Sequence, residues 1–329
     1  MTLYLSERCN SRCITCDYWR HGTADMSLES VRGLLPDLAR LQTRVALISG
    51  GEPLLNSEWP QIAELLRRQG LSLWLLTSGL SLAKHARRAA ELFDAITVSL
   101  DGTDPMTYAA IRGLDAFDKV CEGIRATARA GTPVSVRVTL QRANYRQLPL
   151  FVGLARELGA RQVSFLSVDV ANPHAFARQD DFTRDLALRP EDLPELAAIL
   201  DELERDGAEG FRSGLIADSP RKLRAIHQYF SAVCGLAEYP QVRCNVYEYS
   251  AVIGASGRVS PCFFISGPRH SLLSEQRLAD VLSHPSMSTL REQIRSGTRP
   301  ECSRCVCSLW RSAGSRGAAD FLPPRVTNA

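Results

Sequence analysis

Three cysteines near the start of the chain have a spacing that suits iron–sulfur chemistry. Cys9, Cys13 and Cys16 form a Cys-x3-Cys-x2-Cys run on a loop after the first predicted strand. Three thiolates on one short loop can hold three corners of a cubane 4Fe–4S cluster, which leaves the fourth iron without a protein ligand nearby. Structural zinc normally takes four ligands, often in Cys-x2-Cys pairs, so this spacing suits zinc poorly. The run therefore predicts a cluster with one open iron, where a substrate can bind.

A second group of cysteines lies towards the other end of the chain. Cys244 and Cys262 flank a predicted β-hairpin, and Cys302-Ser-Arg-Cys305 follows further along. Four thiolates suit either a zinc ion or a 4Fe–4S cluster, and the spacing alone does not separate these two. Cys307 is a spare thiol that is an alternative ligand, a hydrogen-atom donor or an inert residue.

Composition and charge narrow the class of protein. The ten cysteines cluster towards both ends of the chain with only Cys121 between, which points to metal or redox chemistry rather than to a disulfide scaffold. There is neither a signal-peptide pattern nor an apolar run of the ~18–20 residues that a membrane span needs, so we expect a cytoplasmic protein without membrane contact. A net charge of +3 is too small to indicate a nucleic-acid partner.

The elements that must position these cysteines alternate between strand and helix patterns. Short β-branched or apolar runs are separated by segments with helical periodicity, which predicts βα units and a parallel sheet that curls into a full or partial barrel. The predicted strands are Thr2–Ser6, Arg44–Ser49, Ser72–Thr77, Ala95–Leu100, Pro133–Leu140 and Gln162–Val168. Gly33 and Pro36 predict a kink or break in the helix that follows Ser27, its expected N-cap.

The regular alternation ends after the sixth strand. We expect a polar loop over 171–189 and then two helices, and the cysteine-bearing hairpin pairs Val246–Ile253 with Arg258–Cys262. One or two short helices are expected within Gln276–Arg295. The tail from Ser312 is rich in glycine, proline and arginine and is predicted to be mobile.

Polar and glycine-rich motifs follow three further strands. Each stands at a carboxyl end, where parallel βα folds build their active sites. These motifs are Gly50-Gly51-Glu52-Pro53, Thr77-Ser78-Gly79 and Ser99-Leu100-Asp101-Gly102, with Ile111-Arg112-Gly113 shortly after the last of them.

Together with the cysteine triplet, these motifs resemble the radical S-adenosylmethionine (SAM) superfamily over residues 1 to about 170. The resemblance implies a partial (βα)6 TIM-like barrel. It also implies that the amino and carboxylate groups of SAM chelate the open iron. One electron from the cluster then cleaves a carbon–sulfur bond of SAM, and the resulting 5′-deoxyadenosyl radical takes a hydrogen atom from a substrate.

The resemblance also assigns roles to the motif residues. Gly50, Gly51, Glu52 and Pro53 match the motif that binds the amino group of SAM. The other implied SAM-binding residues are Thr77, Ser99, Asp101 and Arg112. For Arg112 the alternatives are a bond to a carboxylate and a surface salt bridge. The chain departs from the family at Thr15, where an aromatic residue is usual, although Tyr18 and Trp19 follow and could pack near the adenine or the cluster.

The C-terminal cysteine pattern resembles the auxiliary-cluster extensions called SPASM and twitch. This likeness favours a 4Fe–4S cluster over zinc and assigns Cys244, Cys262, Cys302 and Cys305 as its ligands, in the shorter form with one cluster. The chain then divides into a radical SAM barrel at 1–210, a helical linker at 211–243, a small hairpin-and-helix cluster domain at 244–311 and a tail at 312–329.

The family offers several reactions. We expect a two-electron oxidation of a small polar molecule such as a sugar or cyclitol, with a flavodoxin or ferredoxin as external one-electron donor. The loop after the sixth strand offers Asp169 and His174 as candidate catalytic residues, with Asn172 and Arg178 beside them. The alternatives are thioether formation or epimerisation on a ribosomal peptide, radical epimerisation or decarboxylation of a small molecule, and a zinc-stabilised SAM-binding scaffold.

Overall fold

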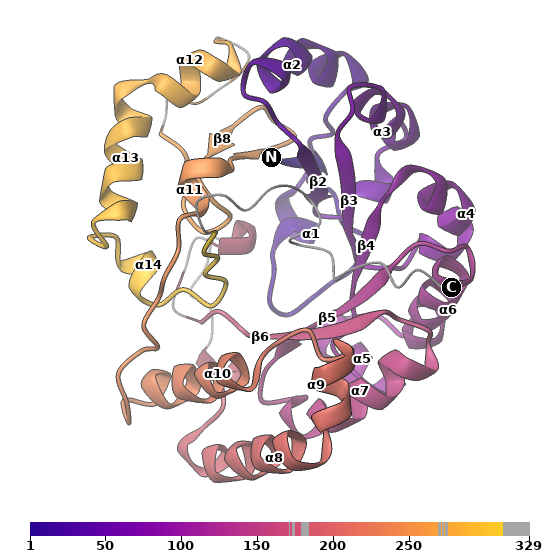
Figure 1. The fold of residues 1–329 in the computed structure, drawn as a ribbon, viewed down its shortest axis with the longest axis vertical. Coiled ribbons are helices and arrows are strands. Elements are labelled where there is room, and N and C mark those ends of the chain that lie inside the picture. The colour runs from indigo at the N-terminus through magenta and orange to yellow at the C-terminus, as the bar shows by residue number, and fades with distance from the viewer. Residues whose placement is uncertain are drawn as a thin grey trace.

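The protein forms an open barrel with a C-terminal extension (Figure 1). The computed structural model describes residues 1–170, 172, 175–178, 184–268, 271, 273 and 276–311. Neighbouring strands of one sheet follow the order β6-β5-β4-β3-β2-β1-β7-β8, so its two edges, β6 and β8, do not pair and the barrel is partial. The six parallel strands are β1 (Thr2–Ser6), β2 (Val45–Gly50), β3 (Ser72–Thr77), β4 (Ala95–Ser99), β5 (Val134–Leu140) and β6 (Gln162–Ser167). The predicted fold class is confirmed.

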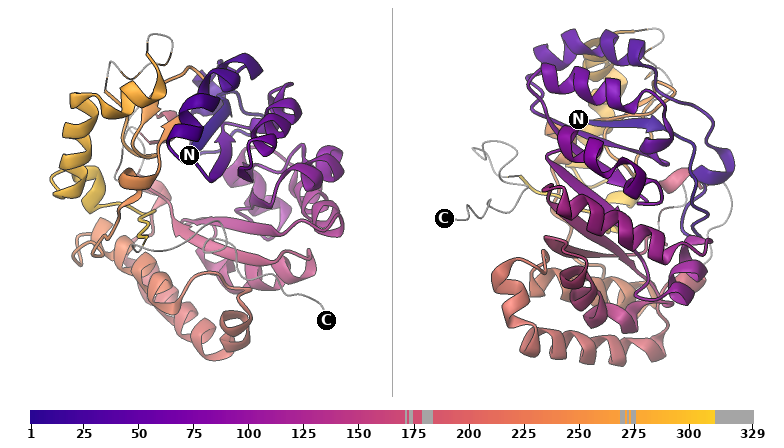
Figure 2. Two further views of the ribbon diagram at one scale, coloured as in Figure 1. Left: turned by 45° about the horizontal axis from the view of Figure 1, so that its top comes forward. Right: turned by 90° about the vertical axis from the view of Figure 1, so that its right-hand side faces the viewer.

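Helices cover the outer face of these strands (Figures 1 and 2). They are α2 (Leu28–Arg40), α3 (Trp59–Arg68), α4 (Leu82–Leu92), α5 (Pro105–Arg112), α6 (Phe117–Arg129) and α7 (Leu148–Glu157). The strand register aligns fully buried apolar side chains under them, namely Leu3, Ile48, Leu75, Ile96 and Val134. Burial of this continuous layer removes a large apolar area from water and holds the sheet and the helices together.

The opposite face of the sheet points into the barrel and carries polar groups. Ser99, Arg137 and Ser164 lie in register across β4, β5 and β6, and Arg137 Nε donates to Ser164 Oγ at 2.8 Å. Ser99 and Arg137 are only half-buried. Because successive side chains of a strand point to opposite faces, this polar row lines the barrel interior while valines of the same strands pack under the helices.

After β6, the chain first forms helices beside that strand and then returns to pair with β1. Helices α8 (Leu193–Asp206), α9 (Ala208–Ser213) and α10 (Pro220–Val233) pack near β6. The hairpin strands β7 (Val252–Ile253) and β8 (Val259–Ser260) follow, and β7 pairs in parallel with β1. The remaining helices are α11 (Val246–Tyr249), α12 (Leu278–Ser283), α13 (Pro285–Arg295) and α14 (Pro300–Ser303). The cysteine-bearing hairpin therefore extends the barrel sheet itself.

Short helices connect the main elements. They are α1 (Tyr18–His21) and the 3-10 turns η1 (Pro53–Leu55), η2 (Tyr145–Gln147), η3 (Ala175–Ala177), η4 (Arg184–Leu186) and η5 (Pro190–Asp192). Helix α9 spans the residue at which we placed the end of the barrel domain. Within the part of the chain that the structure describes, no helix is long and apolar enough to cross a membrane.

Two local predictions were wrong. The predicted break in α2 is wrong, because the helix runs from Leu28 to Arg40 through Gly33 and Pro36, whereas a kink there stays a prediction. Ser27 is its N-cap as expected and accepts a hydrogen bond from the Ser30 amide. Packing of the buried face of α2 outweighs the single bond that a proline removes. The first half of the predicted strand at 246–253 is the short helix α11 instead. The predicted mobile tail lies outside the described residues.

Candidate cluster and cofactor site

The cysteine triplet lies on the loop between β1 and α1, and hydrogen-bond donors point at its sulfur atoms. The Ser11 amide lies 3.5 Å from Cys9 Sγ, and the Ser11 hydroxyl lies 3.2 Å from Cys13 Sγ. The Tyr18 amide donates to Cys16. Donors to ligand sulfurs are typical of iron–sulfur sites, where they stabilise the negative charge of the cluster.

Burial affects two thiols of this loop, although all three cysteines are half-buried as residues. It raises the pKa of Cys9 to about 11 and that of Cys16 to about 12. Iron ions must therefore displace these two protons when the thiolates bind, as metal sites of this kind do. In the loop without iron, Cys9 and Cys16 are therefore expected to be uncharged.

The end of helix α5 holds the triplet loop in place. The carbonyl of Arg112 accepts from the Arg12 amide at 3.0 Å, and the carbonyl of Ile111 accepts from the Ile14 amide at 3.0 Å. Gly113 has a φ of 70°, and a Cβ there would stand 2.4 Å from the Arg12 carbonyl oxygen. Only glycine allows this left-handed turn and this close approach of the loop.

Arg112 joins a strand-end carboxylate to the triplet. Its Nε lies 2.8 Å from Asp101 Oδ2, both side chains are almost fully buried, and its Nη1 lies 3.4 Å from Cys13 Sγ. Asp101 Oδ1 also accepts from the Thr139 amide at 2.7 Å. The surface salt bridge that we considered for Arg112 is therefore wrong, because the pair is inside the protein. A buried cation beside a cysteine ligand offsets the negative charge of a bound cluster.

The Gly-Gly-Glu-Pro segment runs against the start of the triplet loop. The Gly51 amide donates to the Ser6 carbonyl at 2.7 Å, and the Glu52 amide donates to the Arg8 carbonyl at 2.8 Å. Gly50 has a φ of 131°, and a Cβ there would stand 2.2 Å from the Ser6 carbonyl oxygen. The motif thus connects the ends of β1 and β2 at the edge where the cysteines lie.

Glu52 is fully buried, and hydrogen-bond donors surround its carboxylate. Thr77 Oγ1 lies 2.8 and 2.9 Å from its two carboxylate oxygens, and Leu54 N donates to Oε1 at 3.1 Å. Ser78 donates to Oε2 through both its amide and its hydroxyl. Burial raises the pKa of Glu52 above its usual range, although the hydrogen bonds from Ser78, Leu54 and Thr77 oppose the shift.

The structure assigns different contacts to the predicted SAM-binding residues. Thr77 holds Glu52, whereas Ser99 is half-buried on the inner face of the barrel. Ser78 was missing from our predicted site, although it stands where the family often has asparagine. Its position next to Thr77 was the available signal. Direct contacts of these residues with SAM stay predictions.

The loop after β6 returns to the triplet. Asp169 is buried, and its Oδ1 accepts from the Asn172 amide at 3.1 Å. Arg178 is also buried, and its guanidinium reaches the carbonyl of Thr15, one residue before Cys16. We expected Arg178 among substrate-facing residues, but it contacts the cluster loop. The candidate catalytic residue His174 lies outside the described residues.

The four predicted auxiliary ligands converge from three separate segments. Cys262, after β8, lies near Cys302 and Cys244, and Cys305 lies near Cys307, Cys262 and Cys244. All four predicted ligands are half-buried, whereas Cys307 is exposed and its amide donates to Cys305 Sγ at 3.4 Å. The difference in exposure favours Cys305 over Cys307, and the choice of the fourth ligand stays a prediction.

Backbone amides surround one of these thiols. Amides of Phe264 and Ile265 donate to Cys262, as expected around a cluster ligand.

A cavity of about 400 Å³ borders Cys262, one of the predicted auxiliary ligands. Tyr4, Tyr18, Phe176 and Cys262 are among the residues that line it. The Tyr4 ring lies edge-on to Tyr18, with 5.9 Å between the ring centroids. One wall therefore belongs to β1 and α1, beside the triplet, and the facing wall carries an auxiliary ligand.

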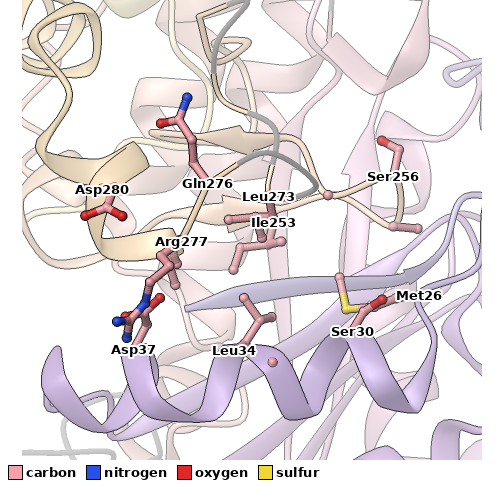
Figure 3. A pocket seen from close by; sticks show the side chains of 14 residues that line it. Met26, Ser30, Leu34, Asp37, Ile253, Ser256, Leu273, Gln276, Arg277 and Asp280 are labelled. Carbon is pink, nitrogen blue, oxygen red and sulfur yellow. The ribbon is translucent and has the colours of Figure 1, made fainter.

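A larger cavity, of about 690 Å³, lies on the outer seam between α2 and the C-terminal extension. Figure 3 shows Arg277 directed at Asp37, and their Nη2 and Oδ1 atoms are 3.0 Å apart. Met26 and Leu34 face Ile253 across this seam. None of its described lining residues is a cysteine, so we assign this cavity to the packing of the extension against the barrel.

Comparison with known families agrees with this geometry. Residues 3–150 match the model of the radical SAM superfamily, and residues 244–306 match that of the SPASM iron–sulfur cluster-binding domain. The chain carries a radical SAM domain and a SPASM iron–sulfur cluster-binding domain. Its two matched domains imply 4Fe–4S clusters and SAM as cofactors. The SPASM match begins at the cysteine where we placed the start of the cluster domain.

Curated relatives of this radical SAM protein carry out different reactions. GTP 3′,8-cyclase 1 of Mycobacterium tuberculosis is 27% identical over 99% of this chain and 86% of the relative. PqqA peptide cyclase of Streptomyces rochei is 31% identical over 50% of this chain and 46% of the relative. A probable GTP 3′,8-cyclase of Methanococcus maripaludis is 29% identical over 48% of this chain. The chain spans about half the length of several curated relatives it matches.

Solved structures share the fold of this radical SAM protein. The enzyme anSMEcpe with bound AdoMet and the Cp18Cys peptide superposes with a TM-score of 0.66 at 17% identity, over 93% of this chain and 89% of that one. SuiB of Streptococcus suis, bound to its precursor peptide SuiA, gives a TM-score of 0.61 at 12% identity, over 94% and 71%. At these identities the likeness concerns the fold.

Proposed function

We propose that this protein cleaves SAM reductively at a 4Fe–4S cluster held by Cys9, Cys13 and Cys16. The observation that carries the proposal is the position of Glu52, whose buried carboxylate stands at the strand edge beside the triplet loop. A cluster with an open iron supplies the electron for the cleavage of SAM when it is bound. Glu52 and the adjoining Gly50-Gly51 backbone orient the amino group of SAM.

Electrostatic features around the triplet support this proposal. Glu52 is an acceptor surrounded by donors, so its carboxylate is held in one orientation and can bind an ammonium group. Arg112 supplies a buried positive charge at Cys13. Ser99 and Asp101, at the end of β4, are the proposed contacts to the ribose or methionine part of SAM.

The polar barrel interior supports a polar substrate. Arg137 and Ser164 form a hydrogen-bonded pair in the row that includes Ser99. A hydroxyl-rich or anionic molecule would find donors and acceptors there, whereas an apolar one would leave buried polar groups without partners. Asp169, at the end of β6, and His174 are the proposed bases for proton removal after hydrogen abstraction.

We further propose that the net reaction is a two-electron oxidation. Cys244, Cys262, Cys302 and Cys305 would hold an auxiliary cluster, which would supply an acceptor for the second electron, and a base of the chain would take the proton that the substrate loses after hydrogen abstraction. A cluster with four thiolate ligands has no open iron, so electron transfer is its simplest role. An external one-electron donor such as a flavodoxin or ferredoxin reduces the triplet cluster for each turnover.

Modification of a ribosomal peptide is the second candidate. A curated relative is a PqqA peptide cyclase, and two solved proteins of this fold are bound to peptides. The cavity beside Cys262 has aromatic walls, which also suit a peptide side chain. A peptide substrate and a small polar substrate would both use the triplet in the same way.

The test is anaerobic reconstitution followed by product analysis. Wild-type protein with SAM and dithionite should release 5′-deoxyadenosine slowly even without substrate, and Cys13→Ala should release none. Mass spectrometry of substrates that stimulate the release then identifies the reaction. A loss of two hydrogens supports oxidation, whereas an unchanged mass indicates epimerisation and a loss of carbon dioxide indicates decarboxylation. Undiminished cleavage by Cys13→Ala would refute the proposed function.

A further inference from the structure

The short turn η3, together with Arg178, touches the triplet loop on both sides of Cys16. Arg178 donates to the Thr15 carbonyl through Nε at 3.2 Å and through Nη2 at 3.0 Å, across 163 residues of sequence. The Phe176 carbonyl accepts from the Asp17 amide at 3.0 Å. The backbone before and after this ligand is therefore held by one segment of four residues, 175–178.

The conformation of this segment is unusual. Phe176 has a φ of 59° and Ala177 a φ of 60°, both in the left-handed region that side chains with a Cβ rarely adopt. The turn directs the Phe176 carbonyl and the Arg178 side chain towards the same loop. Strain of this kind persists only where surrounding contacts impose it, and it is concentrated at functional sites.

Arg178 is fixed on its far side as well. Its Nη1 donates to the carbonyls of Asp169 at 2.8 Å and Asn172 at 3.2 Å. Its side chain is 4% exposed, and its guanidinium stands over the Phe176 ring, 5.1 Å from the ring centroid. The guanidinium of Arg178 thus connects the end of β6, the turn and the triplet loop. Its several N–H donors can bind several carbonyls at once.

The same turn reaches the auxiliary site. The Phe176 ring packs edge-on against Phe264 at 5.7 Å between centroids, and the Phe264 amide donates to Cys262. Phe176 and Ala177 also line the cavity beside Cys262. The turn therefore contacts the surroundings of both proposed clusters and forms part of the wall of this cavity.

We propose that residues 175–178 form a clamp that fixes Cys16 for cluster binding, with Arg178 as its positioning residue. This inference rests on the proposed cluster at the triplet. The two bonds to Thr15 limit motion of the loop, so the clamp slows loss of iron. The buried positive charge near Cys16 stabilises the added electron of the reduced cluster, so it also raises the reduction potential.

The clamp acts at a position where the chain departs from its family. Thr15 stands where an aromatic residue is usual before the third cysteine. Its carbonyl is held directly by Arg178.

The experiment compares Arg178→Lys and Arg178→Gln with wild type in the reconstituted full chain. Lysine keeps the positive charge but lacks the several N–H donors of the guanidinium, and glutamine lacks the charge. The matched control is Arg291→Gln, because Arg291 is a half-buried arginine on α13 that donates to the Leu282 carbonyl at 3.3 Å, away from the triplet. The cluster followed is the one whose electron paramagnetic resonance signal changes when SAM is added.

Two measurements separate the effect of the bonds that hold the Thr15 carbonyl from the effect of the positive charge of Arg178. Loss of iron to a chelator should be roughly tenfold faster in both Arg178 variants, because a charge-assisted hydrogen bond contributes about that factor. In Arg178→Gln alone, the ratio of reduced to oxidised cluster at a fixed potential should fall roughly tenfold, equivalent to about 59 mV for one electron. Arg291→Gln should match wild type in both readouts.

Wild-type rates of iron loss in both Arg178 variants would overturn the clamp. If Arg178→Gln does not fold, Arg178→Lys decides the matter by its rate of iron loss. A wild-type protein without a SAM-responsive cluster would instead refute the proposed function. Failure of the clamp and failure of the function are therefore distinguishable in one series of samples.

Discussion

Ser78 donates two hydrogen bonds to the same carboxylate oxygen of Glu52, from its amide at 2.8 Å and from its hydroxyl at 2.6 Å. This bidentate contact connects the end of β3 to the motif after β2, and it holds a negative charge at the strand edge beside the cysteine triplet. Because the carboxylate is fully buried, its orientation depends on these donors. The relationship makes Ser78 a positioning residue for the proposed amino-group contact of SAM.

We expect Glu52→Gln to weaken SAM binding while the iron content stays unchanged. A hydrogen bond to a charged group contributes about 1.5–3 kcal/mol, which corresponds to roughly ten- to hundredfold in Kd. Equilibrium binding of SAM to the reconstituted variant measures the change. Glu58→Gln is the matched control, since Glu58 accepts a backbone amide from Leu28 at 3.2 Å and should leave SAM affinity intact. Equal affinity in both variants would contradict the role of Glu52.

The pKa of Glu52 gives SAM binding a pH dependence. Burial raises this pKa, so the carboxylate takes up a proton at a less acidic pH than an exposed glutamate does. Protonation removes the negative charge that binds an ammonium group, and therefore SAM affinity should fall as the pH is lowered through the raised pKa. Titration of SAM binding against pH in wild type and Glu52→Gln checks this. The variant should lack the acidic loss of affinity that wild type shows.

Measurement of the iron content tests the two proposed cluster sites separately. Fully reconstituted protein should hold about eight irons per chain, four for each cubane cluster. Changing Cys9, Cys13 and Cys16 together to alanine should leave about four. Retention of the full iron load would refute the assignment of the triplet. One zinc ion per chain together with only about four irons would instead refute the auxiliary cluster.

The auxiliary ligand set makes a separate prediction about the reaction. The double variant Cys302→Ala, Cys305→Ala should lose the auxiliary cluster, cleave SAM and take a hydrogen atom from the substrate, yet form little oxidised product. Cys307→Ala is the control, because its exposed thiol is not among the four predicted ligands. Product yield per 5′-deoxyadenosine is the measurement. Full yield from the double variant would rule out an electron-accepting role for this cluster.

Arg137 should contribute to substrate affinity. Candidate sugars, cyclitols and peptides can be screened by their stimulation of 5′-deoxyadenosine release. The compound that stimulates wild type should act on Arg137→Leu only at roughly thirtyfold higher concentration, since about 2 kcal/mol of charge-assisted bonding is lost. Arg125→Leu, which breaks a surface ion pair with Glu157, is the control. An unchanged concentration dependence in Arg137→Leu would place the substrate elsewhere.

The sequence alone determined the strands and the motifs at their ends. Predicted and observed bounds agree fully for β1 and β3, because short runs of apolar residues are local signals. The cysteine triplet and the Gly-Gly-Glu-Pro motif could also be identified from the sequence, because each is a short run whose residue types and spacing indicate its chemistry. These features require no knowledge of which segments meet in space.

Only the tertiary structure decided which distant residues share the site. The bonds from Arg178 to Thr15 cross 163 residues, and the hairpin strand β7 pairs with β1 at the opposite end of the chain. The row of Ser99, Arg137 and Ser164 depends on the register of three strands. Such contacts follow from the order and curvature of the sheet, which arise from packing of the whole chain. No local sequence pattern predicts them.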